Sequence, residues 1–326
     1  MKVTARDVAI LADTSVSAVS RAFAPDSPLS KDKRARILAA ARTLNYVPPS
    51  AQIAARQSAG TIALVVGDMA NPFYPALLEI LSQELFARQR RLLLHVAPSG
   101  RDVDAVMQQV LEYKADAAII AAATFSSTIA KACAQQNLPV VLFNRIQPGA
   151  NVSAVGCDNY AGGRIIGQRI VNSGRRPVAF VGGLANTSTH IERLRGFSEV
   201  LEQAGVELRH SVSGGYSYDK AFAVIAELLR AKDRPESIFC ANDVMALAAI
   251  DAAKAYGLQV PDDVAVIGFD DIPMAAWQSY QLTTVRQPVD QMVRTALDLI
   301  DQIIDDPAVS GAVRLEAGKL IERVSG

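Results

Sequence analysis

The stretch I62-A-L-V-V-G-D-M-A-N-P-F-Y-P-A-L-L-E-I-L-S-Q-E-L-F-A-R-Q-R-R-L-L-L-H-V96 predicts the fold class of most of this chain. Ile62–Val66 and Leu92–Val96 are apolar runs with the length of buried strands, and Ala76–Arg88 between them has the spacing of a helix. Apolar strands that alternate with helices are typical of parallel sheets covered on both faces. The stretch therefore predicts a strand–helix–strand unit of an α/β fold.

The same alternation continues to residue 304. Further strands are expected at Ala117–Ala121, Val140–Phe143, Val178–Val181, Ser237–Ala241 and Val264–Gly268. Further helices are expected at Asp104–Tyr113, Tyr160–Ser173, Ile191–Ala204, Asp219–Ala231, Val244–Tyr256 and Val289–Ile304. This number of units predicts two α/β lobes with a cleft between them, where ligands bind beyond the carboxyl ends of the strands. Those ends carry Asp68, Asn144, Arg145, Asn242, Asp243, Asp270 and Asp271.

Charge separates the first sixty residues from the rest. The 326-residue chain has 33 basic and 33 acidic residues. Residues 1–60 hold nine lysines and arginines against four aspartates, a net charge of +5, and the remainder carries −5. This balance excludes a uniformly basic nucleic-acid coat and an acidic disordered tail, but it predicts a basic N-terminal domain.

Composition also indicates the compartment. The three cysteines lack CxxC spacing, which favours buried free thiols over a disulfide framework or a zinc cluster. Arg6 and Asp7 interrupt the N-terminal apolar residues, so no signal peptide is expected. No uncharged apolar run approaches the ~20 residues of a membrane span. We therefore expect a soluble, cytoplasmic protein without membrane association.

Residues 4–44 predict three short helices. Val8, Leu11 and Ala12 share one face of the first, with Thr4 as its N-cap and Asp7 in its first turn. Ser15 and Ser30 are the expected N-caps of the second and third helices. The expected inner residues of those helices are Val19, Phe23, Ile37, Leu38, Ala41 and Leu44, and Asn45 is the expected helix stop.

Two helices joined by about three residues form a helix-turn-helix, whose second helix fits the DNA major groove. Its outward residues are Val16, Ser17, Ser20 and Arg21, and Arg21 can make a bidentate contact to guanine. A three-helix bundle that binds protein is the alternative. Residues 46–60 predict a linker, in which Ser50–Arg56 can form a helix only when packed against a partner chain or DNA.

Motifs of catalysis are not found in the sequence. It contains no GxGxxG, GxxxxGK[ST], GxSxG or HExxH, and His95, His190 and His210 lack metal-ligand spacing. Asp270 and Asp271 allow a paired-carboxylate site, but a strand-end aspartate that binds hydroxyls or caps a loop is the favoured interpretation. We therefore expect a binding protein with no catalytic residue, no metal site and no cofactor.

Several blocks, in order along the chain, resemble the LacI/GalR (lactose repressor and galactose repressor) family of transcription regulators. V3-T-A-R-D-V-A and V16-S-A-V-S-R21 are similar to the family's helix-turn-helix signature, and L44-N-Y-V-P48 to its hinge. Residues 62–74 resemble its I-G-L-V-V-P-D-x-x-N-P-F-F block. Other matching blocks are V155-G-C-D-N159, R193-L-R-G-F197, A241-N-D-V-M-A-L247, V266-I-G-F-D-D271 and L282-T-T-V-R-Q-P288.

The resemblance implies a specific fold class and domain order. It implies an N-terminal three-helix helix-turn-helix domain plus hinge helix, joined to an α/β periplasmic-binding-protein-like body of two parallel-sheet lobes. Residues 1–59 would be the DNA-binding domain with its hinge, and 60–326 the effector-binding and dimerisation domain. The N-lobe would cover about 60–159 plus 289–320, and the C-lobe about 160–288.

The resemblance also implies DNA-contacting residues. Base readers fall on Val16, Ser17 and Arg21, and phosphate or anchoring contacts on Thr4, Ser15, Ser20, Ser30 and Tyr46. The serines have helix capping as their alternative role. Ala55 stands where the family has a leucine that wedges into the minor groove, so a strongly kinked operator is in doubt. Asp13 and Ala18 also depart from the signature.

The implied ligand-binding residues are spread over the body. They are Phe73, Tyr74, Asn144, Arg145, Thr189, Arg193, Tyr216, Asn242 and Asp270. Aromatic rings can stack on a sugar or base, Arg193 can hold an oxyanion or hydroxyl pair, and Asp270 with Asn242 can take vicinal hydroxyls. Phe73 and Tyr74 have a helix-start apolar contact as their alternative role.

The resulting hypothesis is a homodimeric DNA-binding transcription regulator, with repression favoured over activation. A small effector between the lobes, such as a sugar, sugar acid or sugar phosphate, would change the separation of the paired linkers and so the affinity for a near-palindromic double-stranded operator. A solute-binding receptor and an α/β sugar-processing enzyme are the alternatives. The sequence leaves open the effector's identity, the operator sequence, and whether effector releases or tightens DNA.

Overall fold

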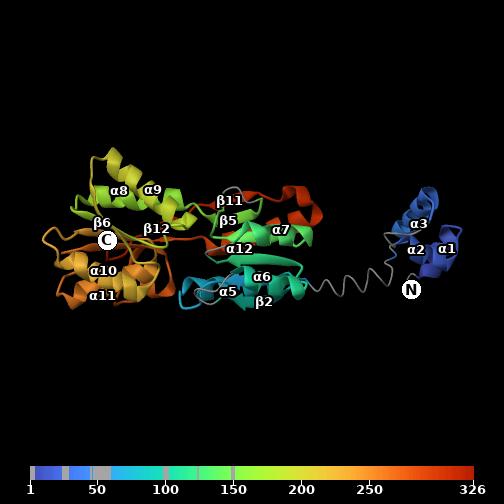
Figure 1. Cartoon of the computed structure of the whole chain (residues 1–326), viewed down its shortest axis with the longest axis horizontal. Helices are drawn as coiled ribbons and strands as arrows, with labels where there is room; N and C mark the ends of the chain where they lie inside the picture. The colour runs from blue at the N-terminus through green and yellow to red at the C-terminus, as the bar shows by residue number, and fades with distance from the viewer. Residues whose placement is uncertain are drawn as a thin grey trace. The chain divides into compact units, whose positions relative to one another are not determined.

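The computed structural model describes residues 4–23, 29–44, 46, 60–97, 103–122, 125–147 and 151–326. The chain divides into two compact units, Met1–Ala59 and Gly60–Gly326 (Figure 1). We call the first unit the head and the second the body. Asn45 and the linker residues 47–59, including Ala55, lie outside the described residues, as does the predicted hinge helix.

The head contains the three predicted helices, α1 (Ala5–Leu11), α2 (Val16–Ala22) and α3 (Lys31–Thr43). The backbone amide and hydroxyl of Thr4 donate to Asp7 Oδ2 at 2.8 and 2.7 Å, and Ser15 Oγ accepts from the Ala18 amide at 3.2 Å. Both predicted caps are confirmed. Ser30 is the N-cap residue of α3, as predicted, and its side chain makes no cap bond. Ser30 is exposed, so water can satisfy the free amides there.

Small side chains make the core of the head. Val8, Val19 and Ile37 are fully buried in it together with several alanines. The prediction that Leu11 faces inward is wrong, because Leu11 is 53% exposed and Ala9 is buried in its place. The buried face of α1 thus centres on Val8, Ala9 and Ala12, since alanines allow α2 and α3 to approach closely. Leu38 is only half-buried.

The first lobe of the body is built on a six-stranded sheet of order β11-β5-β4-β3-β1-β2. Its strands are β1 (Thr61–Val66), β2 (Arg91–Val96), β3 (Ala117–Ala121), β4 (Val140–Phe143), β5 (Ser153–Cys157) and β11 (Val313–Glu316), all paired in parallel. Its helices are α5 (Phe73–Ala87), α6 (Val103–Glu112), α7 (Ser127–Gln135) and α12 (Val289–Asp305), followed by the 3₁₀ helix η2 (Pro307–Val309).

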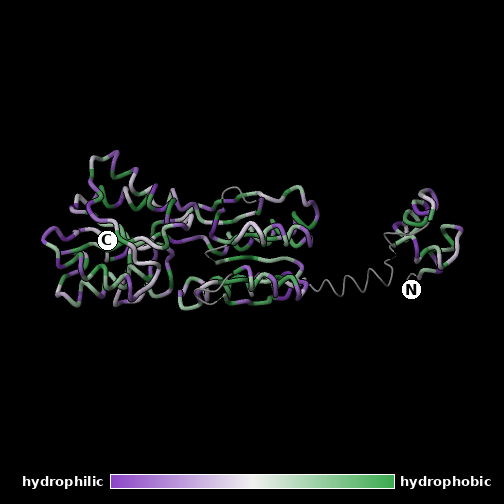
Figure 2. Tube along the Cα trace, viewed as in Figure 1, coloured by the Kyte–Doolittle hydropathy of each residue, from purple (hydrophilic) through white to green (hydrophobic). Residues whose placement is uncertain are grey.

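Alternation along the strands explains why helices cover both faces of this sheet. Ile62 and Leu64 of β1 belong to the apolar cluster that includes α5 and α12, whereas Ala63 and Val65 belong to the cluster that includes α6 and α7. Figure 2 shows these apolar strands inside and more polar segments on the outer helices. The prediction of buried parallel strands is confirmed.

The second lobe repeats the plan with a sheet of order β12-β10-β9-β8-β6-β7. Its strands are β6 (Val178–Gly182), β7 (Leu208–Ser213), β8 (Ser237–Cys240), β9 (Ala265–Asp270), β10 (Thr283–Arg286) and the antiparallel β12 (Lys319–Ile321). Its helices are α8 (Asn159–Ser173), α9 (Ser188–Gln203), α10 (Tyr218–Arg230), α11 (Asp243–Ala255) and the 3₁₀ helix η1 (Pro273–Ala276). Helices α8 and α9 lie together on one side of this sheet, and α10 and α11 on the other (Figure 1).

The three cysteines are free and buried, as predicted. Burial raises the pKa of the Cys133 thiol to about 11 and that of Cys157 to about 12, so both thiols stay protonated at neutral pH. Among the described residues, no helix has the length and apolar character needed to cross a membrane.

Candidate functional site

The outer face of α2 carries the predicted base readers. Val16, Ser17, Ser20 and Arg21 are all exposed, while Ala18, Val19 and Ala22 of the same helix are buried. Arg21 Nε donates to the Ser17 carbonyl at 3.2 Å, so the guanidinium lies along the helix surface. The seven-residue helix thus presents a polar face with one cation, which is the arrangement that a groove-reading helix needs.

The other predicted DNA contacts lie at helix ends. Thr4, Ser15 and Ser30 are the N-cap residues of α1, α2 and α3, and all three are exposed. Tyr46 is half-buried, with its ring centroid 6.2 Å from that of Phe23. Exposed helix N-termini carry free amides and a partial positive charge, both of which favour phosphate. The DNA-contacting roles of these residues remain predictions.

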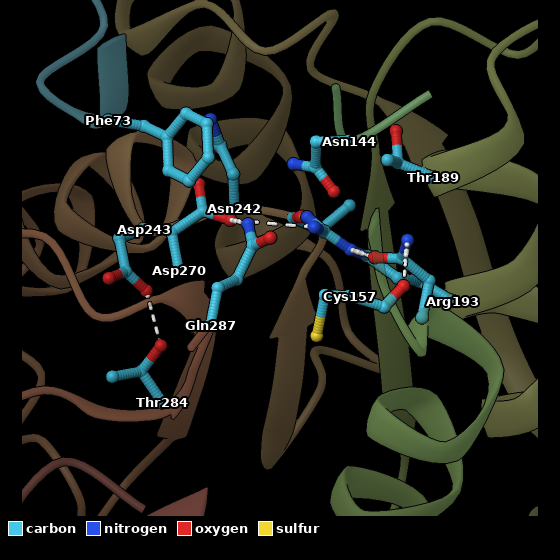
Figure 3. A network of polar contacts seen from close by, with 12 residues as sticks. Phe73, Asn144, Cys157, Thr189, Arg193, Asn242, Asp243, Asp270, Thr284 and Gln287 are labelled. Carbon is cyan, nitrogen blue, oxygen red and sulfur yellow. Dashed lines mark hydrogen bonds and ion pairs between the residues drawn. The ribbon is translucent and has the colours of Figure 1, made fainter. Parts of the chain in front are cut away.

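A second group of predicted residues meets where the two lobes of the body face each other. Asn144 and Arg145 follow β4 in the first lobe, and Asn242 and Asp270 stand at the carboxyl ends of β8 and β9 in the second. Arg145 Nη1 donates to Thr189 Oγ1 across the two lobes at 2.8 Å. We call the interlobe cluster the set Phe73, Tyr74, Asn144, Arg145, Thr189, Arg193, Tyr216, Asn242, Asp270 and Gln287, part of which is drawn in Figure 3.

All three nitrogens and the ring-facing side of the Arg193 guanidinium make contacts within the second lobe. Its Nε donates to Asn159 Oδ1 at 2.8 Å, Nη1 donates to the Ala241 carbonyl, and Nη2 lies 3.5 Å from Asp270 Oδ1 (Figure 3). The guanidinium carbon is 3.6 Å from the centroid of the Phe269 ring, and Arg193 is 2% exposed. These contacts fix the cation in one orientation.

Asp270 and Gln287 continue this network. Gln287 Nε2 donates to Asp270 Oδ1 at 2.6 Å. Burial raises the pKa of the Asp270 carboxyl, and the Arg193 charge opposes that rise. Gln287 was missed by sequence reasoning, although it stands in the quoted block L282-T-T-V-R-Q-P288. The threonine-rich strand before it, β10, lacks the apolar run that predicts a buried strand, so the sequence does not mark Gln287 as a strand-end residue.

The contact between the lobes involves hydroxyl groups. Thr189 Oγ1 lies 3.0 Å from the Tyr216 hydroxyl, and the Ile146 amide donates to Ser188 Oγ at 3.0 Å. A Cβ at Gly183 would come within 2.0 Å of the Tyr216 ring, so the absence of a side chain there admits this ring. Thr189 and Tyr216 are thus brought to Arg145, as the sequence predicts for residues of one site.

Several buried polar atoms of the interlobe cluster have no hydrogen-bond partner among the described residues. They are Asn144 Oδ1, Arg145 Nε, Asn242 Nδ2 and Gln287 Oε1. Since buried polar groups are nearly always paired, donors and acceptors left free at one place indicate a polar ligand. Asn144, Tyr216 and Asp270 also have positive φ angles of 56°, 60° and 124°. Backbone conformations of this kind concentrate at binding sites.

The two aromatic residues at the start of α5 differ in their surroundings. Phe73 is 6% exposed and belongs to the apolar core of the body. Tyr74 is half-buried, with its ring centroid 5.5 Å from that of Phe73. Burial raises the pKa of the Tyr74 hydroxyl, which nearby Arg145 opposes and nearby Asp270 reinforces. Tyr74 therefore places a neutral hydroxyl beside charges from both lobes.

Asp270 and Asp271, the two aspartates considered as a paired-carboxylate site, bind different partners. Asp271 accepts from Arg286 Nε at 2.6 Å and from Arg323 Nη2 at 2.8 Å, so it has a structural role. Behind Asp270 lies Asp243, which accepts from Thr284 Oγ1 at 2.6 Å and from the Ile272 amide at 2.9 Å. No group of three metal-ligating side chains occurs among the residues that the structure describes.

Comparisons with known proteins agree with this architecture. Residues 4–49 match the model of bacterial regulatory proteins of the lacI family, and residues 168–325 match that of the periplasmic binding protein-like domain. The HTH-type transcriptional regulator CelR of Thermobifida fusca is 30% identical over 98% of this chain and 97% of its own. A ribose operon repressor of Halalkalibacterium halodurans is 31% identical over 93% of this chain and 91% of its own.

A solved structure extends the likeness to three dimensions. The transcriptional regulator CelR–cellobiose complex is 28% identical, covers 100% of both chains and superposes with a TM-score of 0.75. The relatives named above are transcriptional regulators rather than enzymes. From its head, its two-lobed body and these likenesses over nearly the whole length, we conclude that this chain belongs to the lacI family of bacterial regulatory proteins and is a DNA-binding transcriptional regulator.

Proposed function

We propose that this protein is a homodimeric repressor in the cytoplasm that binds a near-palindromic operator and is controlled by a sugar derivative at the interlobe cluster. In this proposal the head (1–59) binds DNA, the body (60–326) binds effector and its own copy, and no reaction is catalysed. The observation that carries the proposal is the set of unpartnered polar atoms contributed by both lobes to one place. A ligand that joins them favours one arrangement of the lobes and thereby one DNA affinity.

Charge at the interlobe cluster favours an acidic sugar over a neutral one. Arg193 is paired with Asp270, whereas Arg145 makes no ion pair with a carboxylate among the described residues. A carboxylate or phosphate on the effector would supply the missing anion. The complexes of relatives include one with cellobiose, a neutral sugar, so the charge of the effector is a property in which this chain would differ.

Matched pairs of sugars test the ligand class. We expect galacturonate or a sugar phosphate to raise the melting temperature of the full chain more than the parent neutral sugar does, because only the acidic form pairs with Arg145. The measurement is a thermal shift across such pairs at constant ionic strength. Equal shifts within each pair would contradict the acidic effector, and no shift with any carbohydrate would contradict a sugar derivative altogether.

DNA binding is tested separately on the head. Genomic fragments retarded in a gel at low salt identify the operator, and fluorescence anisotropy then measures affinity. Arg21→Ala should weaken specific binding by about ten- to a hundredfold, the range for losing one bidentate base contact. Arg36→Ala removes the same charge from exposed α3 and should cost less than about threefold. Equal losses in both variants would show that Arg21 does not read bases.

A further inference from the structure

A cavity of about 340 Å³ lies in the second lobe, away from the interlobe cluster. Its lining includes Ser237, the first residue of β8, and Ala265, the first residue of β9. Asn242 and Asp270 of the interlobe cluster stand at the other ends of the same two strands. The cavity therefore opens at the amino ends of the sheet, where neither the sequence analysis nor the family comparison placed a ligand.

Three arginines line this cavity, and their charges are only partly compensated. Arg323 is paired with Asp271. Arg169 donates to an oxygen of Gly326 at 3.0 Å, and its Nε lies 3.5 Å from the carboxylate of Glu322, whose side chain is 66% exposed. Arg175 donates to a backbone carbonyl, that of Asp262, at 3.0 Å and makes no ion pair with a described carboxylate.

A buried hydroxyl in the lining lacks a partner. Ser237 is 1% exposed, and its Oγ forms no hydrogen bond. The buried Nε of Arg169 also makes no hydrogen bond among the described residues, although it forms the ion pair with Glu322. A hydroxyl without a partner at a buried strand position is costly, and an alanine there would avoid the cost. The unpartnered Ser237 hydroxyl beside three arginines therefore indicates that a ligand with acceptor oxygens enters the cavity from outside.

We propose that this cavity is a second binding site, for a small organic anion that carries a carboxylate or a phosphate monoester. Arg169 and Arg175 would hold the anionic oxygens, since guanidinium groups match the geometry of both oxyanions, and Ser237 Oγ would donate to one of them. Ile170, Pro261 and Ile267 supply an apolar wall for the carbon part of the ligand. The volume lies at the lower end of the range for small-molecule sites, which favours a small organic anion over a large one.

The experiment titrates the full chain with inorganic phosphate and, separately, with propionate, against sodium chloride at equal ionic strength. The readout is the melting temperature as a function of anion concentration. A saturable rise with phosphate or with propionate supports the site and identifies the preferred oxyanion. A rise matched by chloride, or no rise with either probe, overturns the proposal.

Two variants locate the binding. Ser237→Ala and Arg175→Gln should each weaken the apparent affinity about tenfold or more, as expected for losing a hydrogen bond to a charged group. Arg209→Gln removes an arginine from the exposed edge strand β7, outside the cavity lining, and should leave the titration unchanged. If the anion binds equally well to Ser237→Ala and Arg175→Gln, it binds elsewhere, for instance at the interlobe cluster, and the second site is refuted.

Discussion

Arg193 and Arg145 belong to the same interlobe cluster, but the two lobes hold them differently. Arg193 uses each of its three nitrogens, lies on the Phe269 ring and is 2% exposed. Arg145 is half-buried, its Nε has no partner, and its one side-chain partner, Thr189, comes from the other lobe. Contacts within the second lobe thus fix the position of Arg193. The position of Arg145, in the first lobe, depends on a contact with the other lobe.

This difference assigns different tasks to the two halves. A half that is already ordered loses little conformational entropy when ligand binds, so it can recognise the ligand first. A half whose contacts cross between lobes gains them only in one lobe arrangement, so its contacts report that arrangement. Substitutions in the second lobe should therefore change stability and binding together, and those in the first lobe should change binding alone.

The largest effect is expected for Arg193→Met. The substitution leaves Asp270 buried beside Gln287 without its cation, and breaking a buried pair costs about 3–5 kcal/mol. We therefore expect the free energy of unfolding, measured by urea denaturation, to fall by about that amount, with loss of effector binding. Arg195→Met, two residues along α9 at an exposed position, should change the free energy of unfolding far less. Equal losses of unfolding free energy in the two variants would refute the claim that internal contacts of the second lobe hold its part of the site in place.

A second effect, spread over about three pH units, is expected from the titration of Asp243 behind the cluster. Burial, with repulsion from Asp270, raises the pKa of Asp243 to about 7. Because the folded pKa lies above the unfolded value of about 4, the folded state binds the proton more tightly. Stability from this group is complete below about pH 4 and is lost as pH rises towards 7, by at most about 1.4 kcal/mol per pH unit.

Asp243→Asn tests that assignment. An asparagine can accept from the Ile272 amide and donate to Thr284 Oγ1, so it keeps both contacts without the charge. Urea denaturation of both proteins between pH 4 and 8 should show the decline in the wild type and a flatter dependence in the variant. If the stability of wild type and variant falls equally as pH rises, Asp243 is not the group that titrates. The proton would then belong to Asp270, the carboxylate within the interlobe cluster.

Sequence reasoning placed part of the interlobe cluster correctly in the fold where apolar strands end in polar residues. Continuous apolar runs predict strands that are buried on both faces. Such strands end at or just before Asn144, Arg145, Asn242 and Asp270. The family resemblance added residues from helices and loops, such as Thr189 and Arg193, which no local pattern marks. Their positions depend on how α9 packs, a property of the whole second lobe.

Two of the strands that were missed, β7 and β10, lack a continuous aliphatic run. β7 is an edge strand with alternating exposure and so lacks an apolar run, and β10 buries Thr283 and Thr284 instead of aliphatic side chains. Thr283 Oγ1 donates to the Arg323 carbonyl at 3.0 Å and Thr284 Oγ1 donates to Asp243, so hydrogen bonds compensate for the burial of both hydroxyls. Partners so distant in sequence leave no local signal, which is also why Gln287 and Asp243 were not assigned to the network.

The smallest effect on stability is expected at Arg145. Substitutions at this residue are the most direct test of the difference between the two lobes. Arg145→Ala removes a bond between lobes and, within the first lobe, a bond to the adjacent Asn144 carbonyl, so the free energy of unfolding should change by less than about 1 kcal/mol. Effector affinity, measured by calorimetry with the ligand found in the carbohydrate pairs, should fall about tenfold or more. Arg145→Lys keeps the charge but replaces the planar guanidinium, whose Nη1 donates to both Thr189 Oγ1 and the Asn144 carbonyl. If lysine restores affinity, the first lobe contributes charge alone; if it does not, the first lobe reads lobe closure through the geometry of this one guanidinium.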